Sequence, residues 1–205
     1  MMGLGVAVGA VGATLGLTAV MPRLQGVLKV FGTPAEECTS EPGGKIRLID
    51  AGAFEGVDAC LMFHPWTATQ LVGSDLAVAA LEISFRGKTA HAAADPWRGA
   101  NAPDGVLLTY TNINALRQHV KSEVRIHGIV THGGDAPNVV PDQASARFAV
   151  RSAARAYLEE VVSRVEDCAR GAALATGTEA VLERLVTMEN TLPNEVLAGI
   201  VRANL

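Results

Sequence analysis

Two adjacent carboxylates follow an apolar run near the start of the chain. The run Gly26–Phe31 is typical of a buried strand, and Gly32 and Pro34 predict a turn that presents Glu36 and Glu37. Because neighbouring residues that leave a strand point in different directions, the two carboxylates can have different roles. One can bind a cation while the other transfers a proton of water bound to that cation. The alternative is a solvated acidic turn.

A histidine follows the next apolar run. Val57–Phe63 predicts a second strand, which ends at His64 because Pro65 cannot continue a ladder of hydrogen bonds. Strands that alternate with helices indicate a parallel sheet, and sites in such sheets lie at the carboxyl ends of the strands. We therefore expect Glu36, Glu37 and His64 at one edge of a sheet. Alternatively, His64 only ends a strand.

From about Asp75 the pattern changes to that of a compact α+β unit. The polar loop Gly87–Gly99 holds a second histidine, His91. Alternation and helical periodicity predict a strand, a helix, two strands, a long helix and a last strand. These elements are expected at residues 76–85, 104–119, 124–130, 144–150, 154–175 and 179–186. They predict a second domain over about residues 75–186.

An uncharged apolar stretch, Gly3–Val20, lies near the N-terminus. Its length is close to the lower limit for a membrane span, and its small-xxx-small spacings can pack transmembrane helices. However, Gly, Ala and Val insert weakly, and no Lys or Arg precedes the stretch. We therefore predict a helix at residues 5–24 that is buried against a sheet, with no membrane partner. A small membrane-anchored protein is the alternative.

Composition limits the class of protein. Of the 205 residues 49% are apolar, so the chain can form a globular core of one or two domains. The net charge of −4, without a basic cluster, argues against a nucleic-acid partner. Three widely spaced cysteines without a CxxC motif predict reduced thiols and a cytoplasmic location.

Several short motifs occur together in one order along the chain. They are Gly32–Glu37, Phe63–Pro65, Gly87–Ala92 followed by Pro96, Gly99 and Asn101-Ala102, then Asn138 within Pro137–Pro141, and Arg151. In this order they resemble the zinc amidohydrolases of the aminoacylase and carboxypeptidase-G type, peptidase family M-twenty. The resemblance is greatest to the branch with the Xaa-Arg (β-alanyl-lysine) dipeptidase and the aminobenzoyl-glutamate hydrolase.

The resemblance implies an α/β fold with two parts. One is a partial catalytic α/β domain, at residues 1–74 and 187–205, which the resemblance implies is truncated at both ends. The other is an inserted ferredoxin-like α+β lid, at residues 75–186, through which the protein forms a homodimer. The resemblance also implies a divalent metal cofactor, two zinc ions, with manganese or cobalt as alternatives.

The resemblance assigns roles in the catalytic domain. Glu36 is the general base that activates water, Glu37 is a metal ligand, and His64 is a further ligand. Further ligands of the family fall outside this chain, so we expect it to be inactive alone. Trp66 is expected to pack at the rim of the site.

The resemblance assigns three roles in the lid. His91 is the histidine that reaches the partner subunit's site and stabilises the oxyanion. Asn138 and Arg151 hold the oxyanion or the terminal carboxylate of the substrate. Each has a simpler alternative: an exposed loop histidine, a turn former and a surface strand residue. Trp97 is expected to pack near the lid loop.

Two functional classes follow. In the first, the chain belongs to a metal-dependent amidohydrolase or dipeptidase that hydrolyses the amide bond of a peptide or an N-acyl amino acid. In the second, it is a dimerising binding module or pseudo-enzyme in which only the lid operates.

Overall fold

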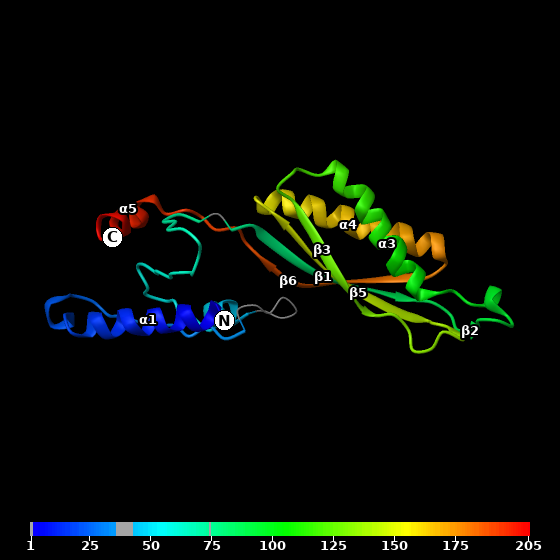
Figure 1. Ribbon diagram of the computed structural model, residues 1–205, viewed down its shortest axis with the longest axis horizontal. Coiled ribbons are helices and arrows are strands. Elements are labelled where there is room, and N and C mark those ends of the chain that lie inside the picture. Colours follow the sequence, from blue (N-terminus) through cyan, green and yellow to red (C-terminus); the bar gives the residue numbers. More distant parts are fainter. Residues whose placement is uncertain (1, 36–42, 74) are drawn as a thin grey trace. The chain divides into compact units, whose positions relative to one another are not determined.

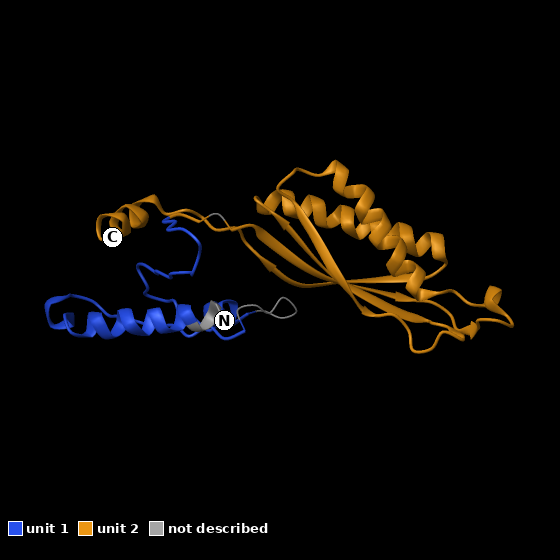
Figure 2. Cartoon of the chain, viewed as in Figure 1, with its two compact units in different colours: residues 1–38, 42–71 blue, residues 39–41, 72–205 orange. Residues whose placement is uncertain are grey.

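The computed structural model describes residues 2–35, 43–73 and 75–205. The chain divides into two compact units, of which one contains the described residues up to Leu71 and the other those from Val72 onward (Figure 2). Within the described residues, no helix combines the length and the apolar character needed to cross a membrane.

The first unit contains helices α1 (Met2–Thr18) and α2 (Gly44–Asp50). The predicted N-terminal helix forms, but it ends at Thr18 and a short 3₁₀ helix with Pro22 follows. Most of the described side chains of α1 are exposed, with Leu15 at 67%, so the predicted burial against a sheet is wrong. A helix that is apolar on all sides carries no pattern that shows which face is covered.

Close packing in the first unit instead involves a glycine of α1. A Cβ at Gly9 would lie 1.9 Å from the ring of Phe63, so only glycine permits this contact. The stacked rings of Phe31 and Phe54, with centroids 4.3 Å apart, join two further segments.

The two apolar runs of the first unit, Gly26–Phe31 and Val57–Phe63, are not strands, and no strand is assigned in the described part of this unit. An apolar run indicates a tendency to be buried, whereas a strand also requires a partner for its backbone hydrogen bonds. The sequence pattern contains no information about that partner.

The second unit is a four-stranded antiparallel sheet with two helices on one face (Figure 1). The spatial order is β3-β5-β1-β6, and the chain order is strand, helix, strand, strand, helix, strand. This is the ferredoxin-like arrangement, so the predicted mixed α/β fold class is confirmed. The elements are β1 (Ala77–Arg86), α3 (Ala102–Leu116), β3 (Arg125–His132), β5 (Gln143–Ser152), α4 (Arg155–Thr176) and β6 (Glu179–Met188).

Smaller elements complete this unit. A two-stranded ribbon is formed by β2 (Ala90–His91) and β4 (Val139–Val140). Two 3₁₀ helices lie at Pro96–Arg98 and Arg117–His119, and α5 (Glu195–Ala203) follows β6.

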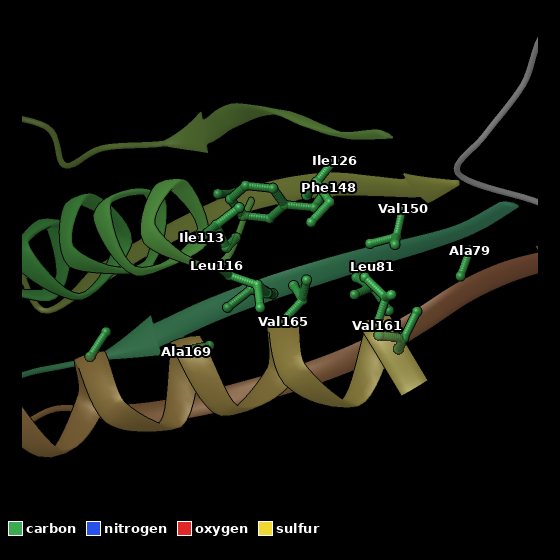
Figure 3. Packing of buried hydrophobic residues seen from close by; sticks show 14 of the residues in the cluster. Ala79, Leu81, Ile113, Leu116, Ile126, Phe148, Val150, Val161, Val165 and Ala169 are labelled. Atoms are coloured by element: carbon green, nitrogen blue, oxygen red, sulfur yellow. The ribbon is translucent and has the colours of Figure 1, made fainter. Parts of the chain in front are cut away.

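The core of the second unit lies between the sheet and its two helices. Alternate residues of β1 and β5 face the helices, and α3 and α4 direct apolar side chains toward them (Figure 3). Phe148 is fully buried, and its ring centroid lies 4.7 Å from that of Tyr110. Burial raises the pKa of the Tyr110 hydroxyl. Helix α4 ends at Gly177, whose φ of 65° favours glycine.

Ion pairs connect α4 to the edge strand β6. The carboxylate of Glu159 accepts hydrogen bonds from Arg184 of β6 at 2.7 Å and from Arg155 at 2.6 Å. The hydrogen bond from Arg184, with a further contribution from Arg155, lowers the pKa of Glu159. This strand edge is therefore held by charged side chains.

Candidate functional site

The predicted base Glu36 and the predicted ligand Glu37 lie outside the described residues. The residues on either side are joined, since the Gly44 amide donates to the Pro34 carbonyl at 3.0 Å. A Cβ at Gly44 would lie 2.4 Å from that oxygen, so this contact requires glycine. The roles of Glu36 and Glu37 remain predictions.

His64 is exposed, and one of its ring nitrogens is committed to the backbone. Its Nδ1 lies 2.9 Å from the carbonyl oxygen of Pro65. A carbonyl can only accept, so Nδ1 carries the proton and the lone pair is on Nε2. Metal-binding histidines are commonly oriented by such a bond from the second ring nitrogen. His64 therefore fits the predicted metal role.

The distance between His64 and its predicted co-ligand Glu37 is not tested by the described residues. Within those residues, no three His, Cys, Asp or Glu side chains are grouped as they would be around a metal ion. The ligand set therefore remains a prediction.

The ribbon brings two predicted lid residues together. His91 of β2 pairs with Val139 of β4, and the Ala92 amide donates to the Asn138 carbonyl at 3.0 Å. Both His91 and Asn138 are exposed. The sequence predicted the two residues but not the ribbon, because strands of two residues have no detectable periodicity. Figure 1 shows β2 at one end of the second unit.

A glycine permits the chain to close around this ribbon. Lys88 and Ala100 form an isolated bridge, with hydrogen bonds of 2.8 and 2.9 Å. A Cβ at Gly87 would lie 2.0 Å from the Ala100 oxygen. The Gly at the start of the Gly-Lys-Thr-Ala-His block is therefore required by a close backbone approach.

The ring of His91 is held by the turn that follows it. Its Nδ1 accepts hydrogen bonds from the amides of Ala93 at 3.2 Å and Ala94 at 3.1 Å. The Asp95 amide donates to the His91 carbonyl at 3.1 Å. The turn thus orients both the backbone and the side chain of His91.

Arg151 lies near the end of β5, on the sheet face opposite the helices. It is half-buried, and its guanidinium has no hydrogen-bond or ion-pair partner in the described part of the chain. The other described arginines without a partner are all exposed: Arg23, Arg86, Arg98 and Arg202.

Arg151 also faces a second arginine. It is directly opposite Arg125 of β3, whose guanidinium donates to the carbonyls of Ser122 at 2.6 Å and Val124 at 2.9 Å. Like charges opposite each other in a sheet are destabilising. An anion bound at Arg151 would relieve this repulsion.

The predicted lid residues do not form one cluster. Strand β5 rises about 26 Å between Gln143 and Arg151. The ribbon with His91 and Asn138 lies at the Gln143 end of β5, since Asp142 accepts from Gly87 directly before β2. A single lid therefore separates Arg151 from the other two residues.

The two tryptophans are surface residues, so their predicted packing is wrong. Trp66 is 70% exposed and Trp97 is 74% exposed. Trp97 belongs to the 3₁₀ helix between β2 and α3, close in the chain to His91. Its position in a polar, non-periodic loop was the available signal that it does not belong to a core.

Comparisons with known proteins agree with the motifs. Residues 77–176 match the family model described as a peptidase dimerisation domain. The Xaa-Arg dipeptidase of Mus musculus is 39% identical over 199 residues, which are 95% of this chain and 46% of the relative. One of the two polypeptides of the p-aminobenzoyl-glutamate hydrolase of Escherichia coli is 34% identical over 84% of this chain and 36% of the relative.

The fold has a match among solved structures. The aminobenzoyl-glutamate utilization protein of Klebsiella pneumoniae aligns with a TM-score of 0.75 and 23% identity, over 95% of this chain and 50% of that protein. The chain spans about half the length of the relatives it matches, or less. The chain is therefore a homologue of the M-twenty peptidases and amidohydrolases, a family of enzymes, and its residues 77–176 are their peptidase dimerisation domain.

Proposed function

We propose that this chain is part of a metal-dependent amidohydrolase or dipeptidase that cleaves the amide bond of a peptide or an N-acyl amino acid. Its homologues include proteins named as a dipeptidase and as an aminobenzoyl-glutamate hydrolase. Because the chain spans less than half of each, the activity belongs to the complete polypeptide, and this fragment is inactive alone.

The observation that carries the proposal is the free, half-buried guanidinium of Arg151. A guanidinium removed from water needs an acidic partner, and it binds carboxylates through two parallel hydrogen bonds. A dipeptide and an N-acyl amino acid both end in a carboxylate. Arg151 then fixes the end of the substrate, while Arg125 remains bound to backbone carbonyls.

The catalytic half supplies the remaining chemistry in this proposal. His64, through the free lone pair on Nε2, and Glu37 would hold a divalent metal ion, of which the complete site has two. We propose zinc, with manganese or cobalt as alternatives. When bound, the metal supplies a Lewis acid and lowers the pKa of water. Glu36 accepts the proton of the attacking water and passes it to the leaving amine.

We further propose a homodimer formed through the second unit. The edge strand β3 exposes Ile129 at 63% and Val130 at 52%. The opposite edge, β6, carries charged side chains, and its Arg184 is bound to Glu159. Unprotected apolar edges favour pairing with another strand, whereas charged edges oppose it. A second copy on β3 is therefore the favoured arrangement.

A dimer also accounts for the separated lid residues. A small substrate cannot contact both Arg151 and the ribbon of one lid, because about 26 Å of strand lie between them. In the proposed dimer, His91 and Asn138 of one subunit complete the site of the other. There they donate hydrogen bonds to the carbonyl oxygen as negative charge develops on it.

The proposed domain organisation follows the same assignment. Residues 1–74 and 187–205 belong to the catalytic domain and residues 75–186 to the lid. We propose a cytoplasmic protein, supported by the free thiols of Cys60 and Cys168. Burial raises the pKa of the Cys168 thiol, which keeps it protonated and weakly nucleophilic.

Substitution of the base tests the proposal. In the complete polypeptide, Glu36→Gln should lower the rate of hydrolysis of dipeptides and N-acyl amino acids by about 10²–10⁴-fold. Metal content by elemental analysis should be unchanged, since Glu36 is not a ligand. Glu55→Gln, in the same unit, is the control and should retain activity.

Two outcomes contradict the proposal. Unchanged hydrolysis by Glu36→Gln would show that Glu36 is not the base. A complete polypeptide that dimerises but contains no metal and cleaves no amide would instead establish the binding module or pseudo-enzyme.

A further inference from the structure

One ring nitrogen of His91 is occupied by two backbone donors. Nδ1 accepts from the amides of Ala93 and Ala94, at 3.2 and 3.1 Å. An N–H group can donate only to an unprotonated nitrogen, so in the neutral ring the proton is on Nε2. The side chain is exposed, which leaves this Nε2–H open to a ligand.

We infer that residues 92–95 are a positioning segment that fixes His91 in the Nε2–H tautomer. In this form His91 presents a neutral hydrogen-bond donor, and not a base or a metal ligand, to the substrate's carbonyl oxygen. The inference rests on the proposed function for the nature of that ligand. The tautomer itself rests only on the hydrogen bonds of the turn.

All four backbone amides after His91 are used. The Ala92 amide donates to Asn138, those of Ala93 and Ala94 donate to the His91 ring, and that of Asp95 donates to the His91 carbonyl. The imidazole thus takes the place of an Asp, Asn, Ser or Thr side chain that accepts from amides two and three residues later. The three alanines add no polar side chain that competes for Nδ1.

The two histidines of the motifs are therefore prepared for opposite roles. In His64 the Nδ1 faces a carbonyl, so Nε2 has a lone pair that can bind a cation. In His91 the Nδ1 faces two amides, so Nε2 has a proton that it can donate. A donor suits a carbonyl oxygen that gains negative charge in the transition state.

The tautomer is tested on the chain as it exists, by ¹⁵N NMR of histidine-labelled protein above neutral pH. The His91 signals are assigned by their loss in His91→Asn. We expect a protonated Nε2 and an unprotonated Nδ1. A protonated Nδ1, or exchange between both tautomers, would overturn the inference.

The turn has a matched pair of variants. In His91→Asn the side-chain oxygen can still accept from Ala93 and Ala94, whereas His91→Ala has no acceptor. We expect the Ala93 and Ala94 amides to remain protected from hydrogen exchange in His91→Asn and to lose protection in His91→Ala. Equal protection in the two variants would show that the ring does not hold the turn.

The donor role is tested separately in the complete polypeptide. His91→Asn keeps the turn but lacks the Nε2–H, so kcat should fall by about 10²–10³-fold with little change in KM. His91→Gln, whose amide reaches nearer to the position of Nε2, should be more active than His91→Asn. Full activity of His91→Asn would overturn the donor role, even where Glu36→Gln abolishes hydrolysis and the proposed function stands.

Discussion

Arg151 differs from every other described arginine because it is half-buried and has no partner. Burial of an unpaired charge is unfavourable, and Arg125 directly opposite adds repulsion. A residue in this environment gains more from binding an anion than an exposed arginine does. The sequence shows an arginine on a strand but not this imbalance of charge.

The carboxylate role of Arg151 predicts a substrate-dependent defect. In the complete polypeptide, Arg151→Gln should lower kcat/KM for a dipeptide by about 10–100-fold, the effect of losing a charge-assisted hydrogen bond worth about 1.5–3 kcal/mol. The same dipeptide with an amidated C-terminus should be hydrolysed at similar rates by both proteins. Steady-state kinetics with the two substrates measure the difference.

Arg86→Gln is the control, because Arg86 is exposed and has no partner among the described residues. It should leave both substrates unaffected. An equal loss of activity of Arg151→Gln on the free and the amidated dipeptide would show that Arg151 does not bind the carboxylate.

At the scale of elements, the ion pairs of Glu159 connect α4 to β6. The lowered pKa of Glu159 means that the folded state binds this proton more weakly than the unfolded state. The stabilisation is therefore fully present above the unfolded pKa. It is lost as the pH falls through the lowered pKa of the folded state.

Glu159→Gln should lower the free energy of unfolding at pH 7 by about 0.5–1 kcal/mol, the size expected for partly exposed ion pairs. The difference from the wild type should disappear in acid, where Glu159 is protonated in both states. Denaturant unfolding as a function of pH measures this. Glu160→Gln, at the exposed neighbouring position, should show no such difference.

The free edge of β3 makes a prediction about association. Ile129→Lys together with Val130→Lys places two charges on this edge, and like charges on two facing edges repel. The dissociation constant of the dimer should rise at least about tenfold, a change of 1.4 kcal/mol. Sedimentation equilibrium measures it.

Leu192→Lys is a control with the same change of side chain at an exposed apolar position outside the sheet. Its dimer should be as stable as that of the wild type. Unchanged association of the β3 variant would assign the interface to another surface.

At the scale of the whole molecule, the core of the second unit is built from its own residues. Every member of the main buried cluster lies between Ala77 and Ala173. Phe148 is at the centre of this cluster and contacts the ring of Tyr110. Loss of its side chain should therefore act on one unit only.

Phe148→Ala should destabilise the second unit by about 3–5 kcal/mol, through lost apolar burial and the cavity that remains. Hydrogen exchange with mass spectrometry should show faster exchange in β1, β5 and both covering helices. Exchange in residues 2–35 and 43–71 should match that of the wild type. An equal increase there would show that the two units unfold together.

The sequence alone determined most of the second unit. Alternation in 76–85 and helical periodicity in 154–175 predicted β1 and α4 within two residues, because one face of each element meets a core. The glycine at 177 marked the end of α4 for a backbone reason that is local. The motif order also indicated the family, which the comparisons confirm.

Only the tertiary structure decided the remaining features. The runs 26–31 and 57–63 are not strands, since pairing depends on a partner that a local pattern does not contain. The ribbon that joins His91 to Asn138, and the facing arginines at 125 and 151, depend on register between distant segments. Hydrogen bonds at Nδ1 set the opposite tautomers of His64 and His91, because a side chain's proton follows its neighbours in space.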